Sequence, residues 1–472
     1  MRTAARYLAD LDDGRQFWLD GARIDDVRTH PATRGAVRTA AGLFDHAAEH
    51  AHELLVELDG VAVNPVNTAP RDAAAADRRR SMMTAWARLS QGFLGRSPDH
   101  VAGLLAGFAA APEAFTDELA ANVVAYQRRV ATEDLYLTYA IVPPQSDPSA
   151  ARHRPRQVEV IAERDDGIVV HGAQLLATAA PLADEVFVTA IRPLPEGEEA
   201  AALSFALPVA APGLRFVLRP PYAPGVTAFD HPLASRYDET DAMVVFDHVL
   251  VPWERLFVYR DRARCRAQFF DTPAHALANI QCLIRLAVKM RFVAAVAHRV
   301  AEVNGRLAGE HTMMLVSDVA ALATVCEGLV EAAHAAAAPD RFGVWRPAER
   351  FLYAGMALQS EFFPRAVTIL RELAGGGVLA VPSSTRDLCD PLERADLDLA
   401  LDGGELSAVD RIRLFKLAWD VVGSEFAGRH VQYELFYSGG TAVVKRYNLR
   451  AFPFADAGAE LDAFLQAADT DA

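Results

Sequence analysis

Several features that would mark a secreted, membrane-spanning or disulfide-bonded protein are missing from this 472-residue chain. It has only four cysteines, they lie far apart, and no two form a CxxC pair. Isolated cysteines are usually small buried side chains in a reducing compartment. The first segment, MRTAARYLADLDDGRQ, lacks the apolar stretch of a secretory signal, and no apolar run approaches the roughly 18 residues of a membrane span. We therefore expect a cytoplasmic protein with no membrane segment.

An excess of basic residues is also missing. Lys and Arg number 47 against 62 Asp and Glu, which leaves a formal net charge of −15. Nucleic acids and anionic membranes attract basic surfaces, so the charge balance argues against both as partners. Hydrophobic residues make up 51% of the chain, enough to bury a large core, and the length indicates two or three domains.

The periodicity of the apolar residues divides the chain into three parts, an α+β multidomain organisation. Residues 1–137 have the pattern of helices and loops, with a break near Gly95 to His100. Residues 138–266 contain short β-branched and aromatic runs separated by turn signals, which predicts an antiparallel sandwich or barrel. Residues 267–472 show long amphipathic repeats, which predict a bundle of four antiparallel helices. We expect the third of these helices to bend at Pro364 and the fourth to run unbroken to about His430.

The segment at residues 231–261 joins the predicted β region to the predicted bundle. It reads HPLASRYDETDAMVVFDHVLVPWERLFVYRD, with a strand that Asp247 and His248 interrupt and Pro252 ends. From Ser235 to Arg255 it matches the pattern S-R-x-D-E-x-D-A-M-V-x-F-D-x-V-x-V-P-W-E-R. This pattern resembles the oxygenase component of the 4-hydroxyphenylacetate 3-monooxygenase family, which belongs to the acyl-CoA dehydrogenase-like superfamily.

The resemblance implies a fold, a cofactor and partners. The fold would be a helical domain at 1–137, a middle β domain at 138–266 and a C-terminal four-helix bundle with tail at 267–472, assembled as a homotetramer. The cofactor would be FAD, supplied as FADH2 by a separate NAD(P)H:flavin reductase, because the chain has no recognisable NAD(P)H-binding domain. The reaction would be hydroxylation of a phenol through a flavin C4a-hydroperoxide.

Four short motifs are the candidate contacts to FAD. The glycine triplet after the third bundle helix would expose backbone N–H groups to a phosphate, although the sequence alone favours a plain helix C-cap. The resemblance favours the first interpretation, often across a subunit interface, and it also assigns FAD contacts to segments similar to F-Y-x-G-D-P, L-A-T and P-Q. The cofactor-binding residues predicted in this way are Gly375, Gly376, Gly377, Ser438, Gly439, Gly440, Thr178 and Gln145. Gly440 and Thr441 replace the Asp-Pro of the family pattern.

Three residues are the candidate catalytic groups, and two of them depart from the family pattern. Arg96 lies in a segment similar to R-S-P-D-Y, in which the arginine binds the phenolic oxygen of the substrate. His100 replaces the tyrosine of that segment, and Tyr139 replaces the histidine of L-T-H. Histidine can accept the phenolic proton and tyrosine can donate a hydrogen bond, so the exchange can preserve the chemistry. Equally, both residues can simply reshape a pocket for another substrate.

Other functions remain open at this point. The same scaffold suits an amine N-hydroxylase, an acyl-CoA dehydrogenase-like enzyme with Glu372 or Glu425 as base, or a flavin-binding protein without activity. A related dehydratase needs an iron–sulfur cluster, and the absence of any cysteine before Cys265 argues against it. If the chain is a tailoring enzyme of natural-product biosynthesis, its phenol could be tethered to a carrier protein.

One metal motif is present by pattern only. His46, Glu49 and His50 fit H-x-x-E-H, which places both histidines on one face of a helix. Such short patterns often occur by chance, and no downstream carboxylate or cleft accompanies this one. We interpret it as a solvated polar face and expect no metal.

Overall fold

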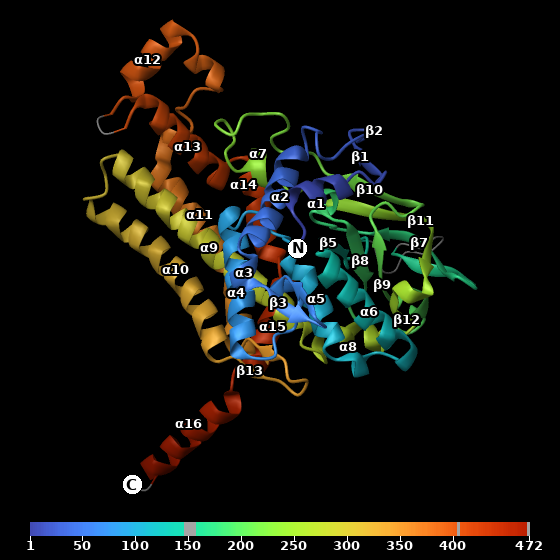
Figure 1. Ribbon diagram of the computed structural model, residues 1–472. Helices are drawn as coiled ribbons and strands as arrows, with labels where there is room; N and C mark the ends of the chain where they lie inside the picture. The colour runs from blue at the N-terminus through green and yellow to red at the C-terminus, as the bar shows by residue number, and fades with distance from the viewer. Residues whose placement is uncertain (146–156, 404–405, 470–472) are drawn as a thin grey trace.

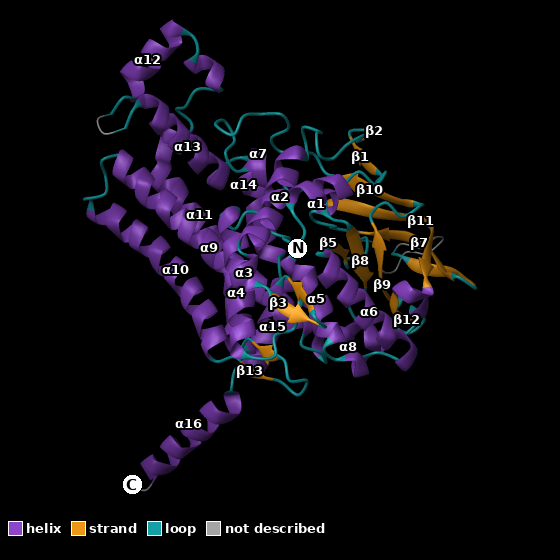
Figure 2. Cartoon of the chain, viewed as in Figure 1, coloured by secondary structure: helices purple, strands orange, loops and turns teal. Residues whose placement is uncertain are grey.

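The computed structural model describes residues 1–145, 157–403 and 406–469. The N-terminal helices lie between a layer of strands on one side and a set of long helices on the other (Figure 1). Figure 2 shows the same separation of strands from bundle helices. The chain therefore has three regions of distinct secondary structure. The N-terminal helices contact both the strands and the long helices.

The N-terminal region supplies the helix on which the site depends. α5 is buried along nearly its whole length and packs against the long helix α9, Ala274–Val303. A Cβ atom at Gly107 would lie 2.2 Å from Ala274 Cα, so only glycine permits this approach. Of the other helices of the region, α6 packs against α5. The set is α1 (Ala4–Asp10), α2 (Arg34–Glu49), α3 (Ala51–Leu54), α4 (Ala73–Leu89), α5 (Asp99–Ala109) and α6 (Asp117–Glu133).

Two sheets form the β layer. One has six strands in the order β2-β1-β10-β11-β7-β6, and the other has four in the order β12-β9-β8-β5. The strands are β1 (Phe17–Leu19), β2 (Ala22–Arg23), β5 (Leu137–Ala140), β6 (Glu159–Arg164), β7 (Gly167–Gln174), β8 (Glu185–Thr189), β9 (Leu203–Pro208), β10 (Leu214–Leu218), β11 (Ala242–Pro252) and β12 (Leu256–Tyr259). Most neighbouring strands pair antiparallel, as expected. Two pairs are parallel, β1 with β10 and β5 with β8, because β1 and β5 enter from the N-terminal region rather than by hairpins.

The strand that Asp247 and His248 interrupt is a single strand, β11, with a β-bulge. Its register against β7 shifts between Phe246 and Val249, and His248 has a positive φ of 55°. A bulge inserts an extra residue without ending the ladder. The strand therefore continues to Pro252, where the missing backbone N–H ends it.

The long helices of the C-terminal region are α9, α10 (Glu310–Ala335), α11 (Glu349–Ala374), α13 (Ala408–Val422) and α14 (Glu425–Phe436). Pro364 lies inside α11, as expected. The prediction of one unbroken fourth helix is wrong, because Gly423 ends α13 and Ser424 starts α14. The Ser424 side chain accepts a hydrogen bond from the backbone N–H of Ala427, as N-cap residues do.

Shorter elements complete the chain. The hairpins β3–β4 (Val56–Leu58 and Val61–Val63) and β13–β14 (Ala338–Pro339 and Trp345–Arg346) lie outside the two sheets. The remaining helices are α7 (Ala234–Tyr237), α8 (Arg262–Phe270), α12 (Pro391–Leu401), α15 (Thr441–Ala451) and α16 (Phe454–Asp469). Figure 1 shows α16 projecting away from the body of the molecule.

One bundle helix has an unusually apolar surface. α10 is long and apolar enough to cross a membrane by length and composition alone, with only 22% of its most apolar window buried. It packs against α9 and α11, as bundle helices of globular proteins do. Its exposed side chains include Met313 and Met314, which are 50% and 57% exposed. None of the described residues covers these two side chains.

Candidate active site

A buried arginine forms the centre of the site. Arg96 lies in the loop before α5 and is 6% exposed. Its Nη2 donates to the carbonyl oxygen of Tyr437 at 2.8 Å, and its backbone N–H donates to Glu239 at 2.8 Å. Its Nη1 has no hydrogen-bond partner, and no carboxylate pairs with the guanidinium in the described part of the chain. The result is a buried positive charge with one free donor.

His100 and Tyr139 lie beside this charge, as the sequence predicts. Their ring centroids are 5.4 Å apart, and the Arg96 guanidinium carbon lies 4.9 Å from the centroid of the Tyr139 ring. Burial, and then the charge of Arg96, hold the pKa of His100 well below its usual value. His100 is therefore neutral near pH 7, and its buried Nδ1 has no hydrogen-bond partner. Burial also raises the pKa of Tyr139, which keeps its hydroxyl protonated.

These three groups favour one kind of ligand. A buried cation without a carboxylate stabilises an anion or a polarised oxygen. A free guanidinium donor beside a neutral imidazole and a phenol hydroxyl can hold a single oxygen atom through several hydrogen bonds. The aromatic rings of Tyr139 and Tyr437 pack against the Arg96 guanidinium, which favours its charged form in this buried setting.

Tyr437, at the end of α14, holds Arg96 in place. Its ring lies between two guanidinium groups, with Arg96 3.9 Å and Arg285 4.4 Å from the ring centroid. Its hydroxyl lies 2.9 Å from the carbonyl oxygen of Gly95 and also contacts Gln281. We did not predict a positioning role for Tyr437, although the F-Y-x-G motif already contains it.

A buried ionic network stands behind Tyr437. Both Glu434 carboxylate oxygens accept from Arg285 at 2.7 Å, and one also accepts from Lys289 at 2.5 Å. Burial alone would raise the pKa of Glu434, but the two cations hold it below its usual range. Burial lowers the pKa of Lys289 to about 7. The sequence feature that could have indicated this network is the presence of Arg285 and Lys289 in a mainly apolar stretch of α9.

Some of the predicted FAD contacts border this pocket. Thr178 accepts a hydrogen bond at its carbonyl oxygen from Thr138, the neighbour of Tyr139, at 2.6 Å. Ser438 follows Tyr437 directly, and its hydroxyl lies 3.1 Å from the Cys282 sulfur. Gly439 has a φ of 110°, a conformation that favours glycine, and Gly440 precedes α15. The Thr178 hydroxyl donates to Asp241 at 2.7 Å, so the Ser438 hydroxyl and the glycine turn after it fit a polar cofactor better than Thr178 does.

The glycine triplet lies far from Arg96, at the end of α11. Gly375 caps α11 with a φ of 52°, so the C-cap interpretation is correct for its backbone. It is 16 residues, roughly 24 Å of helix, beyond Gln359, which contacts the Glu434 network. A Cβ atom at Gly375 or Gly376 would meet no other atom within 4 Å, so both are open to a ligand. Gln145 is exposed and precedes the undescribed residues 146–156.

The residues considered as an alternative catalytic base or as metal ligands do not lie beside Arg96. Glu372 pairs with His311 at 2.7 Å on the surface, and Glu425 is exposed at the start of α14. His46 and His50 stack with ring centroids 4.2 Å apart at the end of α2, where His46 and its neighbours are partly solvated. They do not belong to the group of metal-type donors found among the described residues.

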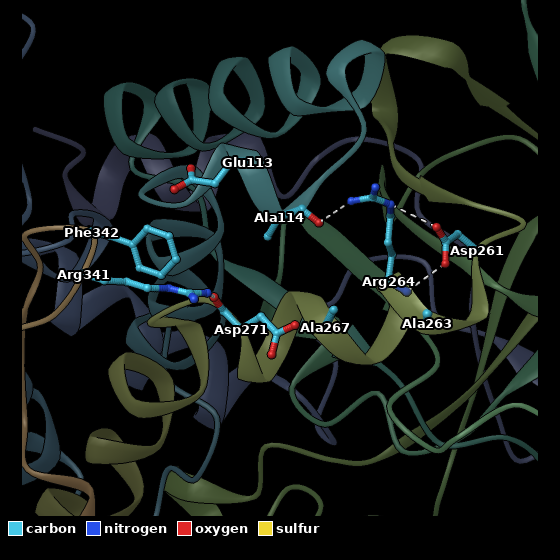
Figure 3. Close-up of a pocket in the computed structure, with 9 residues that line it drawn as sticks. All are labelled: Glu113, Ala114, Asp261, Ala263, Arg264, Ala267, Asp271, Arg341 and Phe342. Carbon is cyan, nitrogen blue, oxygen red and sulfur yellow. Dashed lines mark hydrogen bonds and ion pairs between the residues drawn. The ribbon is translucent and has the colours of Figure 1, made fainter.

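A second cavity of about 420 Å³ lies beside α8 (Figure 3). Its two arginine side chains are engaged by the protein itself. Arg264 donates to the carbonyl oxygen of Ala114 at 2.8 Å and Arg341 donates to that of Asp271 at 2.8 Å. None of the predicted catalytic residues lines it. We therefore place the active site at Arg96 and not in this cavity.

Comparison with known proteins identifies the chain. Residues 3–258 and 265–466 match the family models described as 4-hydroxyphenylacetate 3-hydroxylase N terminal and C terminal. The chain is 34% identical over 456 residues to the pyoverdin chromophore biosynthetic protein PvcC of Pseudomonas aeruginosa, covering 94% of this chain and 90% of that protein. It is 34% identical over 445 residues to the oxygenase component of 4-hydroxyphenylacetate 3-monooxygenase of Thermus thermophilus, covering 93% and 92%.

A solved oxygenase component of 4-hydroxyphenylacetate 3-monooxygenase, complexed with FAD and 4-hydroxyphenylacetate, superposes with a TM-score of 0.93. It shares 32% identity, and the match covers 100% of this chain and 99% of that one. The fold and these relatives thus define a flavin-dependent monooxygenase that uses FAD. Within that class, the chain belongs to the 4-hydroxyphenylacetate 3-hydroxylase family.

Proposed function

We propose that the chain is the oxygenase component of a two-component system that hydroxylates a small phenol next to its hydroxyl group. The observation that carries this proposal is the buried Arg96 guanidinium, which has a free Nη1 and packs against the Tyr139 ring, itself in contact with His100. A buried cation lowers the pKa of a bound phenol, because it stabilises the phenolate. The phenolate is electron-rich at the carbon next to its oxygen, which favours attack there by an electrophilic oxygen.

The chain's own residues would bind and orient the substrate. Arg96 would hold the phenolic oxygen, His100 would receive its proton at Nδ1, and the Tyr139 hydroxyl would donate a hydrogen bond at the reacting end. The rings of Tyr139 and Tyr437 would keep the Arg96 guanidinium in place, because both pack against it. FAD, bound in its reduced form, supplies the electrons that activate dioxygen.

The distribution of the FAD contacts supports a shared site. Thr178 and Ser438 border the pocket, whereas Gly375 and Gly376 are open at the far end of α11. One chain would therefore bind the flavin ring, and the glycine triplet of a second chain would bind the phosphates. The exposed apolar face of α10 would pair the chains, and we propose the homotetramer expected from the sequence.

The partners follow from the chemistry. A separate NAD(P)H:flavin reductase would deliver FADH2, in line with the name oxygenase component borne by the relative from Thermus thermophilus. The similarity to PvcC, a biosynthetic protein, supports a tailoring step on a natural-product phenol. Tethering of that phenol to a carrier protein and the cytoplasmic location stay predictions.

The test uses 4-nitrophenol, whose phenolate is coloured, as the bound probe. Near pH 6, below the pKa of the free phenol, the wild-type protein should bind it as the phenolate and shift its absorbance. With reduced FAD and oxygen, the protein should form a hydroxylated product from a panel of phenols. Arg96→Met should abolish the absorbance shift and lower the product yield by about 100-fold or more, since a charge-stabilising donor is lost.

Arg88→Met, at an exposed arginine on α4, is the matched control and should leave both readouts unchanged. The proposal fails if Arg96→Met still binds the nitrophenolate and still hydroxylates phenols, because the buried cation would then have no part in substrate recognition. Consumption of reduced FAD without hydroxylated product from any phenol or amine would indicate a flavin-binding protein instead.

A further inference from the structure

A cluster of possible metal ligands lies on the six-stranded sheet, outside the site described above. His171 belongs to β7, and Asp247 and His248 belong to the neighbouring strand β11. Among the described residues, these three form a group whose donor atoms all lie within 4.8 Å of one another. Figure 1 shows β7 and β11 on the side of the molecule away from α10 and α11.

The geometry centres on one carboxylate oxygen. Asp247 Oδ1 lies 2.9 Å from His248 Nδ1 and 3.9 Å from His171 Nδ1. The two imidazole rings face each other with centroids 4.8 Å apart. His171 Nδ1 is buried and has no hydrogen-bond partner within 3.5 Å. Two ring nitrogens and one oxygen therefore converge on a common point, with distances close to those between ligands of a single ion.

The other oxygen of the carboxylate is already held. Arg215 on β10 donates to Asp247 Oδ2 at 3.2 Å. This bond orients the carboxylate and leaves Oδ1 for the histidines, in the way that outer-shell partners orient the ligands of metal sites. The pKa of Asp247 is lowered by His248 and Arg215, so the carboxylate is ionised at neutral pH.

The β-bulge makes the cluster possible. In a regular strand, consecutive side chains point to opposite faces, so Asp247 and His248 would be separated by the sheet. The register shift between Phe246 and Val249 and the positive φ of His248 turn both side chains toward the same side. His171 lies on β7 between the two pairs that flank the bulge, Phe246 with Gly172 and Val249 with Val170. It therefore completes the group from the neighbouring strand.

We propose that His171, Asp247 and His248 bind a divalent transition metal ion of the zinc class. Two imidazoles and one carboxylate suit Zn²⁺, Co²⁺, Ni²⁺ or Cu²⁺, whereas Mg²⁺ and Ca²⁺ prefer oxygen ligands. Water would complete the coordination, because the His248 side chain is 66% exposed. The ion would brace β7 against β11 across the bulge and would take no part in the chemistry at Arg96.

Titration calorimetry of the full-length, metal-free protein with Zn²⁺ alone tests the proposal. Wild-type protein should bind one ion per chain at this site. His248→Asn should weaken binding at least 10-fold, and it should fold normally because asparagine tolerates the positive φ. His171→Gln should weaken binding similarly. Zn²⁺ should raise the melting temperature of wild-type protein and not that of either variant, since it stabilises only the state that it binds.

The double variant His46→Ala/His50→Ala is the matched control, because it removes the other pair of stacked histidines. It should leave the Zn²⁺ affinity and the melting-temperature shift unchanged. The proposal is overturned if His171→Gln and His248→Asn bind Zn²⁺ as tightly as wild type, or if only the His46/His50 variant loses binding. Binding that is only millimolar in wild-type protein would mean an adventitious ion only.

Discussion

At the scale of single residues, the chemistry of the site depends on which partner each buried charge has. Glu434 meets two cations, whereas the Arg96 guanidinium pairs with no carboxylate of the described residues and keeps one free donor, Nη1. A buried charge without a counter-ion is costly, so it is retained where a ligand supplies the missing charge. The exchange of histidine and tyrosine relative to the family pattern keeps both residues beside Arg96.

The lowered pKa of His100 predicts how substrate binding depends on pH. A histidine with a depressed pKa stays neutral as the pH falls through about 6.5, the usual histidine value, and gains its proton only below that. The dissociation constant of a phenol should therefore be flat from pH 8 to pH 6 and should rise only at lower pH, when a second positive charge would lie beside Arg96. Fluorescence titration at each pH measures it. An inflection near pH 6.5 that His100→Gln removes would contradict this prediction.

At the scale of elements, α9 and α14 are joined by buried ions rather than by apolar contacts alone. Arg285 and Lys289 on α9 meet Glu434 on α14, and all three are at most 1% exposed. α14 also ends at Tyr437, so this junction determines where the end of the helix places its ring against Arg96. The ionic network thereby links bundle packing to the shape of the pocket.

This junction predicts unequal costs for two substitutions. Glu434→Gln leaves the buried Arg285 guanidinium without a carboxylate, whereas Lys289, with a pKa of about 7, can lose its proton. The free energy of unfolding should fall by about 3–5 kcal/mol. Lys289→Met removes one buried charge of similar length and leaves the Arg285–Glu434 pair, so the loss should be under about 2 kcal/mol. Urea denaturation followed by circular dichroism measures both. Equal losses of unfolding free energy in the two variants would show that the ion pairs do not stabilise the packing of α9 against α14.

At the scale of the whole molecule, the single chain leaves large apolar surfaces uncovered. On α10, Met313, Met314 and Val325 are 50%, 57% and 44% exposed, and on α16 Phe464 is 72% exposed. Contiguous apolar surface of this kind on a globular protein usually marks an interface. The separation of Gly375 and Gly376 from the Arg96 pocket has the same explanation, if a second chain completes each flavin site.

The oligomer can be tested by placing a charge on α10. Met314→Glu should shift the sedimentation mass from tetramer to a smaller species, because a buried carboxylate at an apolar interface is unfavourable. FAD affinity should fall with it, since the flavin site would lose the partner's glycine triplet. Val217→Glu makes a similar change on an exposed sheet position and should leave the mass unchanged. A monomeric wild-type protein that binds FAD fully would contradict the shared site.

Most elements of this fold were predictable from the sequence, and the failures share one physical cause. Amphipathic periodicity revealed the long helices, and alternation with turn residues revealed the strands. The break between α13 and α14 was missed because the apolar stripe continues across Gly423 and Ser424. The parallel pairs of β1 and β5 were missed because local patterns do not report which distant strand is the neighbour.

The sequence by itself determined the family, and it predicts the three-part organisation and the catalytic groups Arg96, His100 and Tyr139, because ordered motifs and hydrophobic periodicity are local properties of the chain. Only the tertiary structure decided which charges meet. It paired Arg285 and Lys289 with Glu434, left Arg96 free, and separated the glycine triplet from the pocket. It also brought His171 to Asp247 and His248 across a bulge. Contacts between residues tens or hundreds of positions apart depend on how the elements pack, which no local pattern encodes.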